Sequence, residues 1–145
     1  MGDKRIVLDS SVIVALHFPE PFSEWCEEII EQYDEFCTVD VAYSEVANAA
    51  WKRIFLFKNP EDQVLTNLNK ALQFINNLCI VLKSRDLIID SISIAIDCGI
   101  TIYDALFLSI AVEQDIPLAT LDKTFASELR DTKYIDVLLH PYKQP

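Results

Sequence analysis

Four acidic residues stand in segments whose other residues are mostly apolar. Asp9 interrupts the run IVLDSSVIVAL, Asp122 ends IPLATLD, and Asp104 opens DALFLSIAV. Glu45 lies in a helical pattern where a narrow polar stripe borders an apolar flank. A buried carboxylate without a partner costs several kcal/mol. Each of these acids therefore needs a partner or a chemical role.

A shared site for these acids would need positive charge. Two carboxylates about 4 Å apart repel by roughly 4 kcal/mol at an effective dielectric near 20. The candidate cations close by in sequence are few, chiefly Lys52, Arg53 and Lys123. A divalent metal is the more economical answer, and an all-oxygen ligand set favours Mg²⁺ or Mn²⁺ over zinc. Such a metal pairs naturally with phosphoryl chemistry, because it clamps phosphate oxygens and activates water.

Each acid also has an ordinary structural explanation. Asp9 and Asp122 suit helix N-caps, since acids favour helix starts. Asp104 suits the third position of a capping box with Thr101, because TIYD matches [ST]xx[DE]. Glu45 could form an ion pair with a nearby lysine. These alternatives stay open for each residue alone, but two acids at strand ends favour a common site.

Strands and helices are expected to alternate along the chain. Strands are predicted at 5–8, 35–39, 79–82, 117–121 and 134–138, and helices at 12–18, 22–33, 41–58, 61–78, 86–98, 101–115 and 123–130. Ser10 or Ser11 is the expected cap of the first helix, Asp40 caps the third, and Gly99 stops the fifth. This alternation predicts a parallel sheet covered on both faces, with ligands at the carboxyl ends of its strands.

The composition suits one compact domain. The chain has 145 residues, of which 51% are hydrophobic, so it can bury a real core. It has only two glycines, which argues against an all-β sandwich. The net charge of −11 disfavours a non-specific DNA binder. A nucleic-acid enzyme with local basic patches or bound cations remains compatible with that charge.

The cysteines and the N-terminus indicate a soluble, cytoplasmic protein. His17 and His140 lie far from any cysteine in sequence, and no CxxC pair occurs, which disfavours a zinc site. The cysteines suit core positions in a reducing compartment. Asp9 interrupts the N-terminal apolar run, which therefore does not match a signal peptide, and no uncharged run reaches membrane-spanning length. The four cysteines are Cys26, Cys37, Cys79 and Cys98.

Taken in order, three segments resemble the motifs of the PIN-domain family of metal-dependent ribonucleases, and within it the VapC-type toxins. They are IVLDSSVIVAL, VDVAYSEVANAAWKR and TIYDALFLSIAVEQDIPLATLD. The resemblance runs from about residue 5 to residue 138. It implies a three-layer α/β/α fold with a five-stranded parallel sheet in the order 3-2-1-4-5. We therefore expect a single PIN-like domain over residues 1–145, ending in a loose tail, HPYKQP.

The resemblance also implies an activity and partners. It implies an endoribonuclease that depends on Mg²⁺ or Mn²⁺, forms a homodimer and is held inactive by a cognate antitoxin protein. By position, Asp9, Asp104 and Asp122 would ligate the metal directly or through water. Glu45 would complete the acidic cluster and orient or deprotonate the attacking water.

Four further residues receive roles in this prediction. Ser11 and Thr120 occupy hydroxyl positions that would support the acidic ligands. Lys52 and Lys123 are candidate contacts to substrate phosphates, although ordinary solvation is the better explanation for a surface lysine. The segment WKRIFLF (51–57) and the helix after it could form the dimer face, and core packing is the alternative explanation.

Two other functions compete with the ribonuclease. A catalytically silent PIN scaffold would act as a protein- or RNA-binding module. A phospho-accepting receiver domain would also carry acids at strand ends. Receivers need adjacent acids after the first strand, but Asp9 is followed by serines, and the third strand runs into Lys83, Ser84 and Arg85. The sequence therefore disfavours the receiver.

Overall fold

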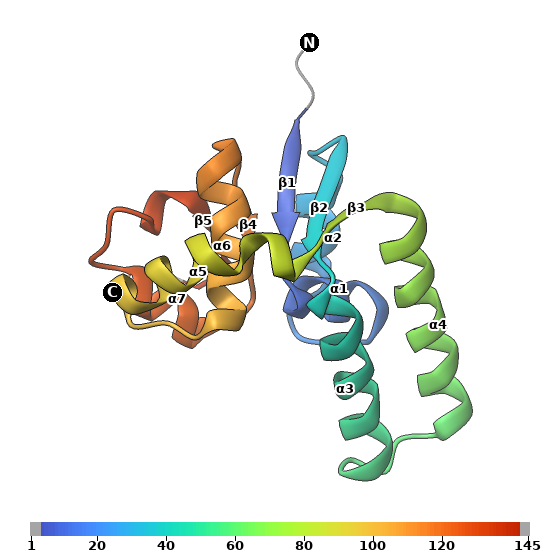
Figure 1. Cartoon of the computed structure of the whole chain (residues 1–145). Coiled ribbons are helices and arrows are strands. Elements are labelled where there is room, and N and C mark those ends of the chain that lie inside the picture. Colours follow the sequence, from blue (N-terminus) through green and yellow to red (C-terminus); the bar gives the residue numbers. More distant parts are fainter. Residues whose placement is uncertain (1–3, 143–145) are drawn as a thin grey trace.

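The computed structural model describes residues 4–142, which form a five-stranded parallel sheet with helices on both sides (Figure 1). The strand order is β3-β2-β1-β4-β5 and every neighbouring pair is parallel, which confirms the predicted topology. The elements, in chain order, are β1 (Arg5–Leu8), α1 (Ser10–His17), α2 (Ser23–Ile30), β2 (Glu35–Val39), α3 (Val41–Phe55), α4 (Glu61–Leu78), β3 (Cys79–Leu82), α5 (Ser84–Cys98), α6 (Ile102–Gln114), β4 (Leu118–Ala119), α7 (Lys123–Leu129), the 3₁₀ helix Ile135–Val137 and β5 (Leu138–Leu139).

The central strand β1 explains where Asp9 lies. Ile6, Val7 and Leu8 have no exposed surface, as expected for a parallel strand covered on both faces. Leu8 pairs with Ala119 of β4, so the residues that follow the two strands meet at the same edge of the sheet. The predicted adjacency of the first and fourth strands is therefore confirmed.

Helices cover the sheet from both sides. On one side α6 packs against β1, β2 and β4, and α5 packs against α6. On the other side α1 packs against β1, and α4 packs against β2 and β3. The pair α3 and α4 extends beyond the carboxyl edge of the sheet (Figure 1). Residues 105–111 of α6 are all buried, which accounts for its nearly uniform apolar sequence.

Several predicted helix boundaries need correction. The first helix starts at Ser10 rather than Val12, because Asp9 and not a serine is its N-cap. The third helix ends at Phe55, before the predicted end at Lys58. Asp40 precedes it but makes no capping bond, because its carboxylate accepts a hydrogen bond from the Ser84 N–H at 3.2 Å instead.

The last two strands are shorter than predicted. β4 and β5 each contain two residues, and residues 135–137 of the predicted fifth strand form a 3₁₀ helix. Gly99 ends α5 as predicted, with φ +70°, a conformation that glycine adopts without strain. All four cysteines are free thiols, and Cys26 and Cys37 lie in the core.

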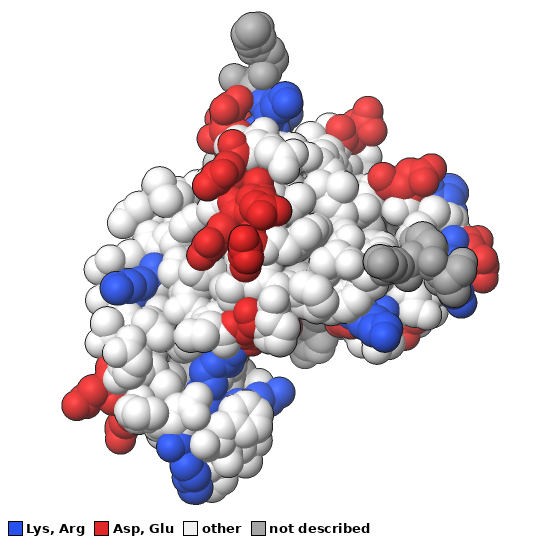
Figure 2. Space-filling view, turned by 180° about the vertical axis from the view of Figure 1, so that it is seen from behind, with Lys and Arg blue, Asp and Glu red and all other residues white. Residues whose placement is uncertain are grey.

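Charge is distributed unevenly over the molecule. The face seen in Figure 2 carries a group of acidic side chains on its upper part, whereas basic side chains gather at the lower end. Lys52 and Arg53 in the last turn of α3, and Lys58 just after it, place positive charge at the projecting helical pair. Within residues 4–142, no single helix is long and apolar enough to cross a membrane; only α5 and α6 together pass that test, across a 109° bend.

Candidate active site

Asp9 is buried where β1 ends and α1 begins. Its Oδ1 atom accepts hydrogen bonds from the Val12 N–H at 3.3 Å and from the Ser11 hydroxyl, so the N-cap alternative is a real part of the structure. Burial raises the pKa of Asp9 to about 6, against the opposing effect of hydrogen bonds from Ser11, Thr120 and the Val12 N–H. Asp9 is thus a helix cap whose ionised form is disfavoured by burial.

Asp122 follows β4 and caps α7. Its Oδ1 atom accepts a hydrogen bond from the Phe125 N–H at 3.0 Å. The Thr120 hydroxyl accepts from the Asp122 N–H at 3.0 Å, and the Ser11 hydroxyl accepts from the Leu121 N–H at 2.9 Å. The two hydroxyls therefore link the end of β1 to the end of β4. Their supporting role toward a metal stays a prediction.

Asp104 lies in the first turn of α6 and faces the other acids. The Thr101 hydroxyl accepts a hydrogen bond from the Asp104 N–H at 3.2 Å, as the capping-box alternative requires. Burial, together with the negative charges of Asp122, Asp9 and Glu45, raises the pKa of Asp104 to about 7. Asp104 therefore lies within electrostatic reach of the other three predicted acids.

Glu45 points into a cleft on the α1 side. The Ser10 hydroxyl donates a hydrogen bond to Glu45 Oε1 at 2.6 Å, and no ion pair to Glu45 forms among residues 4–142, contrary to the lysine alternative. The cleft has a volume of about 640 Å³ and contains Lys52 in its wall. Its polar and aromatic lining comprises Ser10, Ser11, Glu20, Ser44, Glu45, Asn48, Lys52, Arg53, Phe57 and Tyr103.

The C-terminal segment also contacts the site, so the predicted loose tail is wrong for residues 140–142. The Tyr142 hydroxyl donates a hydrogen bond to the Leu121 carbonyl, and its ring packs edge-on to Phe22 with centroids 5.3 Å apart. Burial and the charge of Asp122 raise the pKa of Tyr142. Lys123 lies with its Nζ 5.9 Å from the Tyr142 ring centroid. Residues 143–145 of the tail lie outside the described residues.

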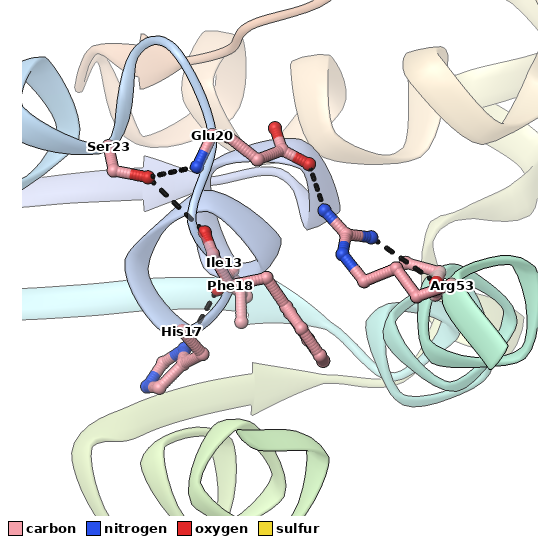
Figure 3. Close-up of polar contacts among 7 residues, drawn as sticks. Ile13, His17, Phe18, Glu20, Ser23 and Arg53 are labelled. Carbon is pink, nitrogen blue, oxygen red and sulfur yellow. Dashed lines mark hydrogen bonds and ion pairs between the residues drawn. The ribbon is translucent and has the colours of Figure 1, made fainter. Parts of the chain in front are cut away.

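Two charged residues of the cleft were given no site role by the sequence, although Arg53 was named as a nearby candidate cation. Glu20 and Arg53 form an ion pair across the cleft wall, between the loop after α1 and the end of α3 (Figure 3). The sequence holds weak signals for both residues. Arg53 is eight residues after Glu45 and so shares its side of a helix, and Glu20 stands between Pro19 and Pro21.

The acids suit a hard divalent cation. Within residues 4–142, no group of three histidine, cysteine or acidic side chains is arranged closely enough to hold a metal ion by itself. Mg²⁺ does not need one, since it keeps several waters and is commonly held by one or two carboxylates together with substrate phosphates. The donors are all oxygens, and the pKa values of Asp9 and Asp104 are raised chiefly by burial and also by neighbouring acids, a charge environment that a bound cation would relieve.

Comparisons with known proteins agree on one family. The family model of the PIN domain matches residues 6–127. Ribonuclease VapC3 of Pyrobaculum aerophilum is 33% identical over 124 residues, covering 86% of this chain and 94% of the relative.

Two solved structures share the fold. The protein in a crystal structure from P. aerophilum is 22% identical in sequence to this chain, with a TM-score of 0.65. The match covers 86% of this chain and 79% of the P. aerophilum chain. A toxin–antitoxin complex from Klebsiella pneumoniae has 13% identity and a TM-score of 0.62, covering 96% of this chain and 99% of its own. At these identities the two structures bear on the fold alone.

Proposed function

Because the chain belongs to the PIN domain family, we propose that it is an Mg²⁺- or Mn²⁺-dependent endoribonuclease and the toxin of a toxin–antitoxin pair. The observation that supports this proposal is the electrostatic environment of Asp104, whose pKa is raised to about 7 by burial and by the negative charges of Asp122, Asp9 and Glu45. The P. aerophilum relative is named as a ribonuclease, which supports RNA as the substrate class.

We assign the acids distinct roles. Asp9, Asp104 and Asp122 would hold the cation, with Glu45 completing the cluster. When bound, the cation supplies charge neutralisation at phosphate oxygens and activation of water. Glu45, oriented by its 2.6 Å hydrogen bond from Ser10, would accept a proton from the attacking water.

Hydrolysis would then proceed by displacement at phosphorus. The water oxygen forms a bond to phosphorus, the bond from phosphorus to the 3′ oxygen breaks, and a proton reaches that oxygen. The products are a 5′-phosphate and a 3′-hydroxyl. Ser11 and Thr120 would hold Asp9 in place, and Lys52 and Lys123 remain candidate phosphate contacts. A cytoplasmic location stays a prediction.

A cleavage assay tests the activity. We expect the wild type to cut RNA in Mg²⁺ or Mn²⁺ and to stop in EDTA, and Asp104→Asn to lose at least about 100-fold in rate, as is usual when a group that stabilises charge is removed. Asp90→Asn is the matched control, because Asp90 is an exposed acid of α5. Sequencing the RNA ends after expression would identify the target. Equal cleavage by wild type and Asp104→Asn would contradict the proposal.

The alternative is a silent PIN scaffold that binds a protein or RNA partner. It would gain support if calorimetry detected no Mg²⁺ or Mn²⁺ binding at millimolar concentrations. An antitoxin partner is supported by the structural likeness to a chain of a toxin–antitoxin complex. We also propose a homodimer, whose interface is considered below. The whole chain, residues 1–145, is taken as one functional domain.

A further inference from the structure

We propose that Arg53 anchors a phosphate of the RNA substrate beside the acidic cluster, and that Glu20 occupies this guanidinium until RNA displaces it. This inference rests on the proposed ribonuclease function. It adds Arg53 as a residue that positions the substrate. The Glu20 carboxylate would take the place of a substrate phosphate while no RNA is bound.

The guanidinium of Arg53 is held in a defined orientation. One nitrogen, Nη1, donates to the Ala49 carbonyl at 3.2 Å, and the other, Nη2, pairs with Glu20. The guanidinium carbon also lies 4.6 Å from the centroid of the Phe18 ring, which is itself buried (Figure 3). Because the side chain is already ordered, binding a phosphate would cost little further conformational entropy.

The position of Arg53 is where substrate needs a cation. It lines the cleft together with Ser10, Ser11 and Glu45, so a strand of RNA running through the cleft passes close to the Glu45 carboxylate. Phosphates near that acid need a positive charge close by. Lys52 also lines the cleft, but it is exposed and forms no ion pair within the described range 4–142. Arg53 is the ordered cation, with only 14% of its side chain exposed.

Glu20 is presented to Arg53 by a fixed turn. The Glu20 N–H donates to the Ser23 hydroxyl at 3.0 Å, and that hydroxyl donates to the Phe18 carbonyl at 3.2 Å (Figure 3). Pro19 and Pro21 restrict the backbone on both sides. The turn is fixed, but 31% of the Glu20 side chain is exposed, so the carboxylate can rotate into solvent.

Exchange of one anion for another is chemically simple here. The planar fork of arginine binds carboxylates and phosphates through the same paired N–H groups. The Glu20 contact joins one carboxylate oxygen, Oε1, to one nitrogen, Nη2, so a phosphate that takes this position replaces a single contact. Arg53 would therefore keep an anionic partner throughout, and no covalent bond changes.

The test measures binding of a labelled single-stranded RNA oligonucleotide to Asp104→Asn protein in Mg²⁺, where cleavage should be absent. We expect Arg53→Gln to weaken binding about tenfold, the effect of losing a hydrogen bond to a charged group. It should also reduce the slope of log K against log salt by about 0.7, the value for one phosphate contact to a single strand. Lys58→Gln is the control, because it removes one charge just beyond α3 with Lys58 exposed and outside the cleft lining.

Glu20→Gln distinguishes exchange from a merely structural ion pair. If Glu20 competes with phosphate, Glu20→Gln tightens RNA binding several-fold, and this gain disappears in the Arg53→Gln background. Weaker binding in Glu20→Gln would overturn the exchange. Circular dichroism checks folding, and Arg53→Lys, which keeps the charge but loses the fork, is expected to bind between wild type and Arg53→Gln.

Failures of the two proposals look different. If wild type cleaves RNA and its Asp104→Asn form binds it, but Arg53→Gln behaves like Lys58→Gln, this inference alone is overturned. If wild type shows no cleavage and the Asp104→Asn form shows no RNA binding, the proposed ribonuclease fails and the inference fails with it.

Discussion

Asp9 and Asp122 cap helices in a way that stays compatible with the chemical roles proposed for them. Asp9 and Asp122 cap α1 and α7 through Oδ1, so the capping bonds do not commit the second oxygen of either side chain. A cap also holds a carboxylate at a helix N-terminus, where the partial positive charge of the helix stabilises it. The two explanations for each acid are therefore compatible, and the structural one supports the catalytic one by fixing the geometry.

The raised pKa values predict how stability varies with pH when no divalent cation is present. Burial raises the pKa of Asp9 to about 6 and that of Asp104 to about 7, from an ordinary value of 3.8. The folded protein therefore binds protons more tightly than the unfolded chain does. The stabilising contribution is complete below about pH 4 and is lost as pH rises to about 7. Urea unfolding in EDTA across this range measures it.

Asp104→Asn tests the assignment of this pH dependence. In the variant, the free energy of unfolding should fall less steeply as pH rises, because the contribution of Asp104 is gone. The variant should also be more stable than wild type near pH 8 in EDTA. Added Mn²⁺ should stabilise wild type more than the variant. Asp90→Asn, on the exposed face of α5, should keep the wild-type slope. Equal slopes for wild type and Asp104→Asn would contradict the assignment.

At the scale of elements, sequence patterns predicted the long and buried segments best. The bounds of β1, β2, β3 and α4 match the prediction, because an apolar run between polar ends, or a long 3.6-residue period, carries a strong local signal. β4 and β5 did not keep their predicted lengths. Each makes its sheet contacts through only two residues, and that pairing is decided by neighbouring strands rather than by local pattern.

The site was predictable only in part. The four acids could be located because each is out of place in an apolar or helical pattern, and because strand ends share one edge of a parallel sheet. The contacts of Ser10, Glu20, Arg53 and Tyr142 could not be located in the same way. They join residues 21 to 35 positions apart in the chain, and only the packing of loops and helix ends brings those pairs together.

Tyr142 illustrates such a contact and gives a prediction for the C-terminal segment. Tyr142→Phe removes the hydrogen bond to the Leu121 carbonyl and should lower the free energy of unfolding by about 1 kcal/mol. Tyr142→Ala should cost more, because packing against Phe22 is lost as well. Urea denaturation measures both variants. Tyr134→Phe is the control, since the Tyr134 hydroxyl forms no hydrogen bond within residues 4–142. If Tyr142→Phe matched that control, the tail would not be anchored in solution.

At the scale of the whole molecule, two apolar surfaces remain exposed. The sequence predicted residues 51–57 as part of a candidate dimer face. In the structure, Trp51 stacks on Phe55 there, with ring centroids 5.1 Å apart, and both side chains are exposed. The structure adds a stripe on α5 that sequence reasoning missed, where Ile89 and Ile96 are 80% and 75% exposed. A monomer rarely leaves a contiguous apolar surface of this kind in water, so each is a candidate interface. Phe57 of the first surface also lines the cleft, which the proposed RNA substrate would enter.

We therefore expect the proposed homodimer to form through the α5 stripe, which comprises Ile88, Ile89, Ile92 and Ile96 on one side of the helix. Ile89→Glu should convert the dimer to a monomer in light scattering, because the interface would bury a charged glutamate from each chain. Phe55→Glu, at the α3 surface, is the matched variant and should leave the dimer intact. A monomeric Phe55→Glu with a dimeric Ile89→Glu would instead place the interface at residues 51–57, where the sequence first suggested it. A monomeric wild type would remove the dimer from the proposal, and the cleft that Glu45 lines would then act within one chain.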